Sequence, residues 1–101
     1  MYNRILNLMD KGFNHRYEMI FEVKLKNSND KQFLDPSVKD LKILAKTIGF
    51  TCSLKKLSAG KFKLRLNHVP QPVYGEIRHI VNETNELLGK NSLKLVFEQN
   101  V

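Results

Sequence analysis

The sequence predicts an α+β fold in which a four-stranded antiparallel sheet carries two helices on one face. Three segments alternate apolar and polar residues with a period of two, as strands do when one of their faces is buried, and residues 93–98 form a fourth, largely apolar strand segment. Two other segments repeat apolar residues at steps of three and four, which is typical of amphipathic helices. The segments follow in the order strand, helix, strand, strand, helix, strand. This is the order of the split βαβ, or ferredoxin-like, arrangement.

The chain opens with a predicted short helix, which the clearest strand follows. Residues 2–11 carry a narrow apolar stripe made by Ile5, Leu6, Leu8 and Met9. Gly12 acts as a stop, so we assign residues 1–13 to an N-terminal helix. The strand begins at Tyr17 and ends at Lys26. Its expected inward residues are Tyr17, Met19, Phe21, Val23 and Leu25. A polar loop is expected over residues 27–32.

The first long helix is expected to begin at Asp35. The Asp35 carboxylate would accept the free amide hydrogens of the first turn, and Pro36 suits the first helical position. The expected buried stripe consists of Val38, Leu41, Leu44, Ala45 and Ile48. Three lysines lie on the opposite side at helical spacing: Lys39, Lys42 and Lys46. Gly49 ends the helix.

A β-hairpin is expected over residues 50–66. Its inward residues are Phe50, Cys52 and Leu54 and, on the return strand, Phe62, Leu64 and Leu66. The alternation breaks at Lys56-Leu57, which indicates a bulge or the start of the turn. Ser58-Ala59-Gly60 forms the turn, with glycine where a positive φ is expected. Two prolines in residues 67–72 predict a rigid connection.

The second helix is expected over about residues 73–88, and the last strand over residues 93–98. The helix stripe consists of Ile77, Ile80, Val81, Thr84, Leu87 and Leu88, and Gly89 caps it. These elements share one core, so we interpret residues 1–101 as a single domain with a βαββαβ core over residues 17–98. Right-handed crossovers place both long helices on one face of the sheet. The expected open face carries Glu18, Ile20, Glu22, Lys24, Lys26, Thr51, Ser53, Lys55, Lys61, Lys63, Arg65, Lys94, Val96 and Glu98.

The positive charge is concentrated in one third of the chain. The formal net charge is +7, and residues 31–66 alone hold nine lysines and arginines against two acids. The remainder holds eight bases and eight acids and is therefore neutral. A neutral scaffold with one strongly basic segment is typical of proteins that bind a polyanion.

The sequence shows no pattern for catalysis or for cofactor binding. The spacing of metal ligands is not found among the histidines His15, His68 and His79. The single cysteine, Cys52, alternates in phase with the inward residues of its strand and is expected in the core. Glycine-rich phosphate loops and nucleophile elbows are not found. We therefore expect a protein without enzyme activity, metal or cofactor. No apolar stretch is long enough for a membrane span, and we expect the protein in the cytoplasm, or in a host cytoplasm if the gene is viral.

The leading hypothesis is a small basic regulatory protein that contacts the phosphate backbone of DNA or RNA. The candidate residues are Lys55, Lys56, Lys61, Lys63 and Arg65 of the hairpin, with Lys39, Lys42 and Lys46 of the first long helix. The aromatic residues Tyr17, Phe21 and Phe62 alternate in phase with the core, which argues against base stacking on the open face and favours a duplex. Glu18 and Glu22 could instead pair with the hairpin cations across the sheet, which would leave those cations solvated and without a partner molecule.

The alternative is a protein-interaction module. Such an inhibitor or assembly subunit would dock on an acidic protein surface, and its small size would suit a phage or mobile-element gene. The expected sheet edges, residues 50–57 and 93–98, could pair with another chain, and a homodimer is one form of such pairing. Ile20 and Val96 are the apolar residues expected on the open face.

Overall fold

A computed structural model describes residues 16–100 of the chain. These residues form an α+β structure with a four-stranded antiparallel sheet and two α-helices. The elements in chain order are β1 (Arg16–Lys24), η1 (Ser28–Asp30), α2 (Lys31–Ile48), β2 (Thr51–Ser58), β3 (Lys61–Pro70), η2 (Gln71–Val73), α3 (Tyr74–Leu88) and β4 (Leu93–Asn100). The predicted N-terminal helix, residues 1–13, lies outside the described residues.

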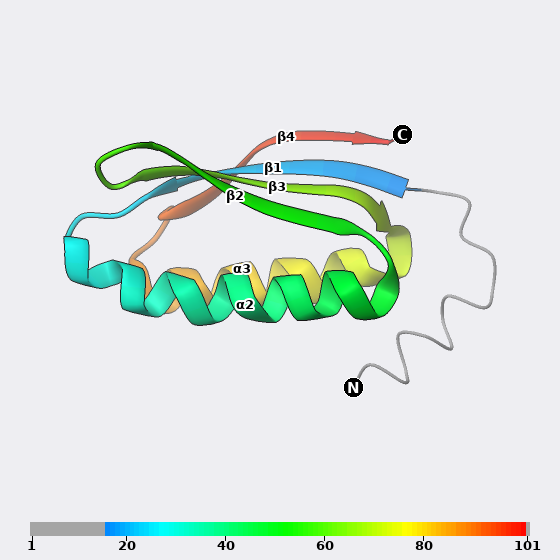
Figure 1. The fold of residues 1–101 in the computed structure, drawn as a ribbon, viewed down its shortest axis with the longest axis horizontal. Coiled ribbons are helices and arrows are strands. Elements are labelled where there is room, and N and C mark those ends of the chain that lie inside the picture. Colours follow the sequence, from blue (N-terminus) through cyan, green and yellow to red (C-terminus); the bar gives the residue numbers. More distant parts are fainter. Residues whose placement is uncertain (1–15, 101) are drawn as a thin grey trace.

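The strands lie in the order β2-β3-β1-β4, and each neighbouring pair is antiparallel. Both helices cover the same face of this sheet (Figure 1). The strand order and the helix count fit a ferredoxin-like fold. The other face, called the open face below, carries no helix of residues 16–100. Within that range no helix is both long and apolar enough to cross a membrane.

The core fills the space between the sheet and the helices. Six of the predicted inward residues of the two central strands are buried: Met19, Phe21, Val23, Phe62, Leu64 and Leu66. The other two, Tyr17 and Leu25, are partly buried against this core. The predicted stripe of α2 is buried too: Val38, Leu41, Leu44, Ala45 and Ile48. Each large apolar side chain removed from water in this way stabilises the fold by roughly 1.5–3 kcal/mol. The periodicity therefore identifies the correct inward faces of these elements.

The start of α2 corrects the sequence analysis. The helix begins at Lys31, not at Asp35, and Pro36 lies inside it. Asp35 is therefore a helical residue and not a cap, and Pro36 leaves the carbonyl four residues earlier without its helical donor. The physical reason is Leu34, which is fully buried on the same side as Val38. Burying this leucine favours an additional helical turn before the proline.

The β2–β3 hairpin has a bulge, which is one of the two alternatives expected at Lys56-Leu57. Its register shifts between Lys56 and Ser58, so Leu57 is the extra residue on β2. Ala59 and Gly60 form the turn, and Gly60 has a φ of +71°. The tip of the hairpin also contacts the end of β1, because the Leu25 amide donates a 2.8 Å hydrogen bond to the Gly60 carbonyl.

The strand β3 is longer than predicted. Residues 67–70 continue the strand instead of forming a separate rigid connection, and Val69 is fully buried. A bulge at Asn67 and His68 accommodates this extension of the strand. His68 there has a φ of +61°, and its amide donates to the Asn67 side-chain oxygen at 3.0 Å. The bulge lets the strand follow β1 to its beginning, where Arg16 faces Pro70.

The strand β4 carries a bulge that the sequence does not predict. Its register against β1 shifts so that Ile20 faces Phe97 while the next residue, Phe21, faces Leu95. The extra residue is Val96, and beyond it the two faces of β4 exchange. The expected open-face position of Glu98 is therefore wrong. Glu98 is opposite the buried Met19 on the helix side of the sheet.

The Glu98 carboxylate contacts the hydroxyl of Tyr74 at the start of α3. This hydrogen bond is the main reason that the pKa of Tyr74 is raised. Tyr74 also packs edge-to-face on Tyr17, with ring centroids 6.0 Å apart. The late half of β4 is thereby fixed to α3.

The stripe of α3 is confirmed at four positions, Ile77, Val81, Thr84 and Leu88, and Ile80 is partly buried against the core. The prediction for Leu87 is wrong, because this side chain is 65% exposed. It lies about 80° around the helix axis from Ile77. The stripe that packs on α2 and the sheet is too narrow to include it.

Candidate nucleic-acid interface

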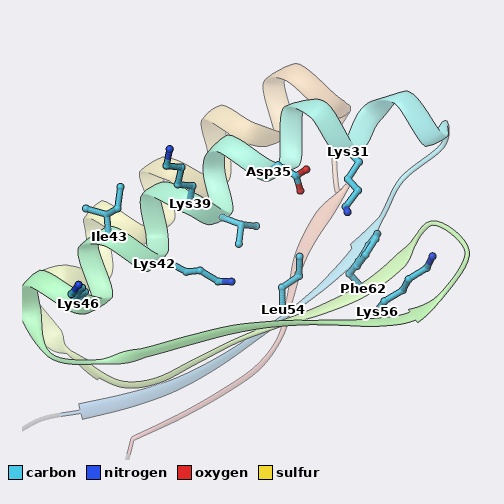
Figure 2. Close-up of a pocket in the computed structure, with 10 residues that line it drawn as sticks. Lys31, Asp35, Lys39, Lys42, Ile43, Lys46, Leu54, Lys56 and Phe62 are labelled. Atoms are coloured by element: carbon cyan, nitrogen blue, oxygen red, sulfur yellow. The ribbon is translucent and has the colours of Figure 1, made fainter.

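A groove runs between α2 and the edge strand β2. Its volume is about 670 Å³. Figure 2 shows Lys31 and Lys42 reaching from the helix toward the sheet. We call this feature the lysine groove; it is lined by Lys31, Asp35, Val38, Lys39, Lys42, Ile43, Lys46, Leu54, Lys56 and Phe62. Of the eight predicted site residues, the groove brings together four: Lys39, Lys42, Lys46 and Lys56.

Helical phase explains why α2 presents its lysines there. Lys31, Lys42 and Lys46 fall within about 60° of one another around the helix axis, on the flank beside β2. The opposite flank faces α3. It carries Asp40, which lines a separate hollow with α3 residues. The helix therefore divides its charges, with cations on the groove side and an acid on the α3 side.

The lysine pair of β2 is divided between the two faces of the sheet. Lys56 is opposite Phe62, a core residue, and therefore points to the helix side and into the groove. Lys55 is opposite Lys63 on the open face. The sequence analysis grouped both lysines in one hairpin site, but adjacent residues of a strand point to opposite faces.

The electrostatics of the groove are strongly positive. Its five lysines face one carboxylate, Asp35. None of the ion pairs found among residues 16–100 involves a groove lysine. Five lysines along one groove concentrate positive electrostatic potential there.

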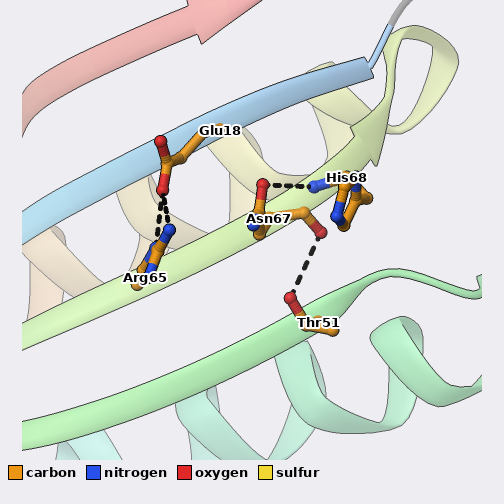
Figure 3. A network of polar contacts seen from close by, with 5 residues as sticks. All are labelled: Glu18, Thr51, Arg65, Asn67 and His68. Carbon is orange, nitrogen blue, oxygen red and sulfur yellow. Dashed lines mark hydrogen bonds and ion pairs between the residues drawn. The ribbon is translucent and has the colours of Figure 1, made fainter. Parts of the chain in front are cut away.

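The cations of the open face are partly neutralised. Arg65 forms an ion pair with Glu18, in which the Arg65 Nε donates to a carboxylate oxygen at 2.6 Å (Figure 3). Glu22 lies opposite Lys63 on one side and Lys94 on the other. Its pKa is lowered, chiefly by a contact with Lys24 at 3.0 Å. The cross-strand pairing that the sequence suggested is thus present for Arg65, and Lys55, Lys61 and Lys63 remain on this face.

One groove residue, Lys31, was missed by the sequence analysis. It was assigned to the loop before the helix, because the start of the helix was expected at Asp35. The signal that could have found it is Leu34, an apolar residue four positions before Val38. That spacing extends the apolar stripe by one turn and includes Lys31 in the helix.

Cys52 lies on the inward side of β2, as its parity predicts. Burial raises the pKa of its thiol to about 11, although the nearby Lys42 acts in the opposite direction. A thiol with such a pKa carries little thiolate at neutral pH and is a weak nucleophile. In the described range no group of three or more histidine, cysteine, aspartate or glutamate side chains could hold a metal ion.

Comparison with known proteins gives no family for this chain. No family model matches it, and neither the curated proteins nor the solved structures contain a match.

Proposed function

We propose that this protein binds nucleic acid through the phosphate backbone, with the lysine groove as the contact surface. The observation that carries the proposal is that five lysines from two elements line one groove that holds a single carboxylate. Each phosphate that a lysine neutralises releases counterions from the nucleic acid, and this release favours binding at low salt. A regulatory role in the cytoplasm is the context we expect for such binding.

A duplex is the preferred ligand. The groove lysines of α2 extend from Lys31 to Lys46, which corresponds to about 22 Å along the helix axis. This length equals the axial rise of about six nucleotides of one strand of a DNA duplex. Proteins that bind single strands stack bases on exposed aromatic rings. The aromatic ring in the groove, Phe62, is buried.

The binding should be insensitive to base sequence. Lysine contacts to phosphates position a protein on a duplex but do not read its bases. If four of the five groove lysines contact phosphates, log K falls with log salt with a slope of about −3.6. Affinity then decreases about 100-fold between 50 and 200 mM salt.

Fluorescence anisotropy with labelled duplex DNA, duplex RNA and single-stranded DNA tests the proposal. The groove variant combines Lys39→Gln, Lys42→Gln and Lys46→Gln. The matched control combines Lys55→Gln, Lys61→Gln and Lys63→Gln on the open face. Both variants remove three positive charges, so any difference between them reports location and not net charge.

We expect the groove variant to lose most of its affinity for the duplex. The slope of log K against log salt should become less negative by about 2.7, because three phosphate contacts are lost. The control should lose much less. Equal losses in both variants would show that only the net charge matters, and a larger loss in the control would move the site to the open face. A wild-type protein that binds no nucleic acid at low salt would refute the proposal.

A second candidate is docking of an acidic protein segment in the same groove. One observation favours it: Ile43 lines the groove and is 45% exposed, although a phosphate backbone does not require an apolar contact. A synthetic peptide of alternating glutamate and leucine is a suitable probe. The substitution Ile43→Ser should weaken peptide binding and leave duplex binding unchanged, whereas the groove lysine variant should weaken both.

A further inference from the structure

The sheet of the described residues has two edge strands, β2 and β4, and they differ in protection. The edge of β2 carries Lys55 and Lys56 next to the bulge at Leu57. Charged side chains and bulges are the usual means by which an edge avoids pairing with another chain. The sequence of β4, Leu93–Asn100, contains no proline and only one lysine. Its unpaired backbone groups are therefore the more available of the two edges.

The edge of β4 is also apolar where it is exposed. Val96 is 51% exposed and Phe97 is 40% exposed. Phe97 is opposite Ile20 in the register with β1, so both lie on the open face. Monomeric proteins seldom expose neighbouring apolar residues on an unpaired edge, because such an edge pairs readily with another strand.

The charge distribution identifies a second copy of this chain as the fitting partner. A chain with a net charge of +7 repels its copies unless they meet at a neutral surface. The strand β4 carries one cation, Lys94, and one anion, Glu98, and is neutral. The lysine groove lies at β2, the opposite edge of the sheet. Pairing through β4 therefore keeps the basic segments of two copies as far apart as the sheet allows.

The faces of β4 select one register for such pairing. Lys94, Phe97 and Gln99 are opposite open-face residues of β1, whereas Leu93, Leu95, Glu98 and Asn100 are opposite residues of the helix side. An antiparallel pair centred between Val96 and Phe97 places Lys94 opposite Gln99 of the second copy. It also places Val96 opposite Phe97 of the second copy. In this register open-face residues meet open-face residues along the whole strand, because the bulges of the two strands compensate each other.

We propose that β4 is the interface of a two-fold symmetric homodimer, in which two sheets join edge to edge. The interface consists of backbone hydrogen bonds between the two β4 strands and an apolar cluster of Ile20, Val96 and Phe97 from each copy. Each copy presents the same surface to the other, as two-fold symmetry requires. This inference does not depend on what the lysine groove binds.

Light scattering after size exclusion tests the interface in the full chain. The wild-type protein should have twice the monomer mass of 11.8 kDa. The substitution Val96→Lys should return it to the monomer mass. The matched control Leu87→Lys places the same charge at an exposed leucine of α3 and should remain a dimer. A monomeric wild type, or a Val96→Lys variant that remains dimeric, would overturn the proposal.

Cysteine cross-linking tests the register without a disruptive charge. A chain with both Lys94→Cys and Gln99→Cys places cysteines directly opposite each other across the interface, within disulfide distance. Oxidation should convert most of it to a covalent dimer. Each single variant should remain uncross-linked, because its two cysteines are about 17 Å apart in this register. Cross-linking that is equal in the single and double variants would refute the register.

Discussion

The contact between the hairpin tip and β1 predicts that Gly60→Ala destabilises the protein. Two effects add at this position. Gly60 has a φ of +71°, where a residue with a Cβ atom costs about 1–2 kcal/mol. A Cβ atom built there would lie 2.9 Å from the Leu25 carbonyl oxygen, a backbone atom that cannot easily move away.

The magnitude follows from these effects. Displacing the hairpin tip weakens the hydrogen bond from the Leu25 amide to the Gly60 carbonyl, which is worth about 1 kcal/mol. Replacing glycine by alanine restricts the unfolded chain and offsets about 0.4–1 kcal/mol of the loss. The net decrease in the free energy of unfolding is about 2 kcal/mol. For a chain of this size it lowers the melting temperature by on the order of 10 °C.

Two other glycine variants serve as controls in urea and thermal unfolding followed by circular dichroism. Gly49→Ala meets the same type of backbone penalty at a φ of +101°, but a Cβ atom there would have no neighbour within 4 Å. It should cost about 1 kcal/mol. Gly75→Ala lies in α3 with open space around it and should stabilise the protein by about 0.5–1 kcal/mol. If Gly60→Ala cost no more than Gly49→Ala, the close contact with Leu25 would be refuted.

Three further predictions concern other contacts. Thr84→Val should lower the free energy of unfolding by about 1–2 kcal/mol in urea titrations, because the buried Thr84 hydroxyl lies 2.6 Å from the Ser37 hydroxyl, which would lose its partner. Glu18→Gln removes the ion-pair partner of Arg65; it should leave duplex affinity in anisotropy nearly unchanged if the groove is the site, and a marked gain would implicate the open face. Because the pKa of Cys52 is raised in the fold, the unfolded chain loses this proton first as pH rises. The contribution of Cys52 to stability should therefore be complete below about pH 9 and decline between about pH 9 and 11, and a Cys52→Ala variant should lack this decline in urea titrations.

The sequence was sufficient to predict the order and type of the four strands and two α-helices, because burial of one face imposes a period of two on a strand and of 3.6 on a helix. The two short 3-10 helices, η1 and η2, were not predicted. The inward residues of β1, such as Met19 and Phe21, are fully buried as the alternation requires. The break of the alternation at Lys56-Leu57 indicated a bulge or the start of the turn, and the structure has the bulge.

The errors arise where a longer-range contact overrides a local signal. Pro36 is a strong local signal for a helix start, but the burial of Leu34 against the core extends α2 before it. The bulge at Val96 lies within the apolar run Leu95-Val96-Phe97, where three successive apolar residues do not distinguish the buried face from the open face. Its existence depends on how β4 fits against β1, which a single strand does not encode.

The candidate site was predicted in composition but not in geometry. Net charge and helical spacing identified Lys39, Lys42 and Lys46, which lie together in the groove. Lys55 and Lys56 were predicted as one group, although adjacent residues of a strand point to opposite faces. The position of α2 beside the β2 edge brings Lys56 into the groove with the helix lysines. That position depends on the packing of the whole domain.

The uneven placement of charge gives the described part of the molecule an electric dipole moment. The cations of the groove lie at one edge of the sheet, while β4 at the other edge is neutral and α3 carries Glu76, Glu83 and Glu86. In the nucleic-acid binding that we propose, this dipole would turn in the field of the polyanion before contact, so that most encounters would begin with the β2 edge in front. The association rate should consequently fall with ionic strength more steeply than net charge alone requires. The order of the strands in the sheet thus determines which edge of the molecule would face a polyanion during approach.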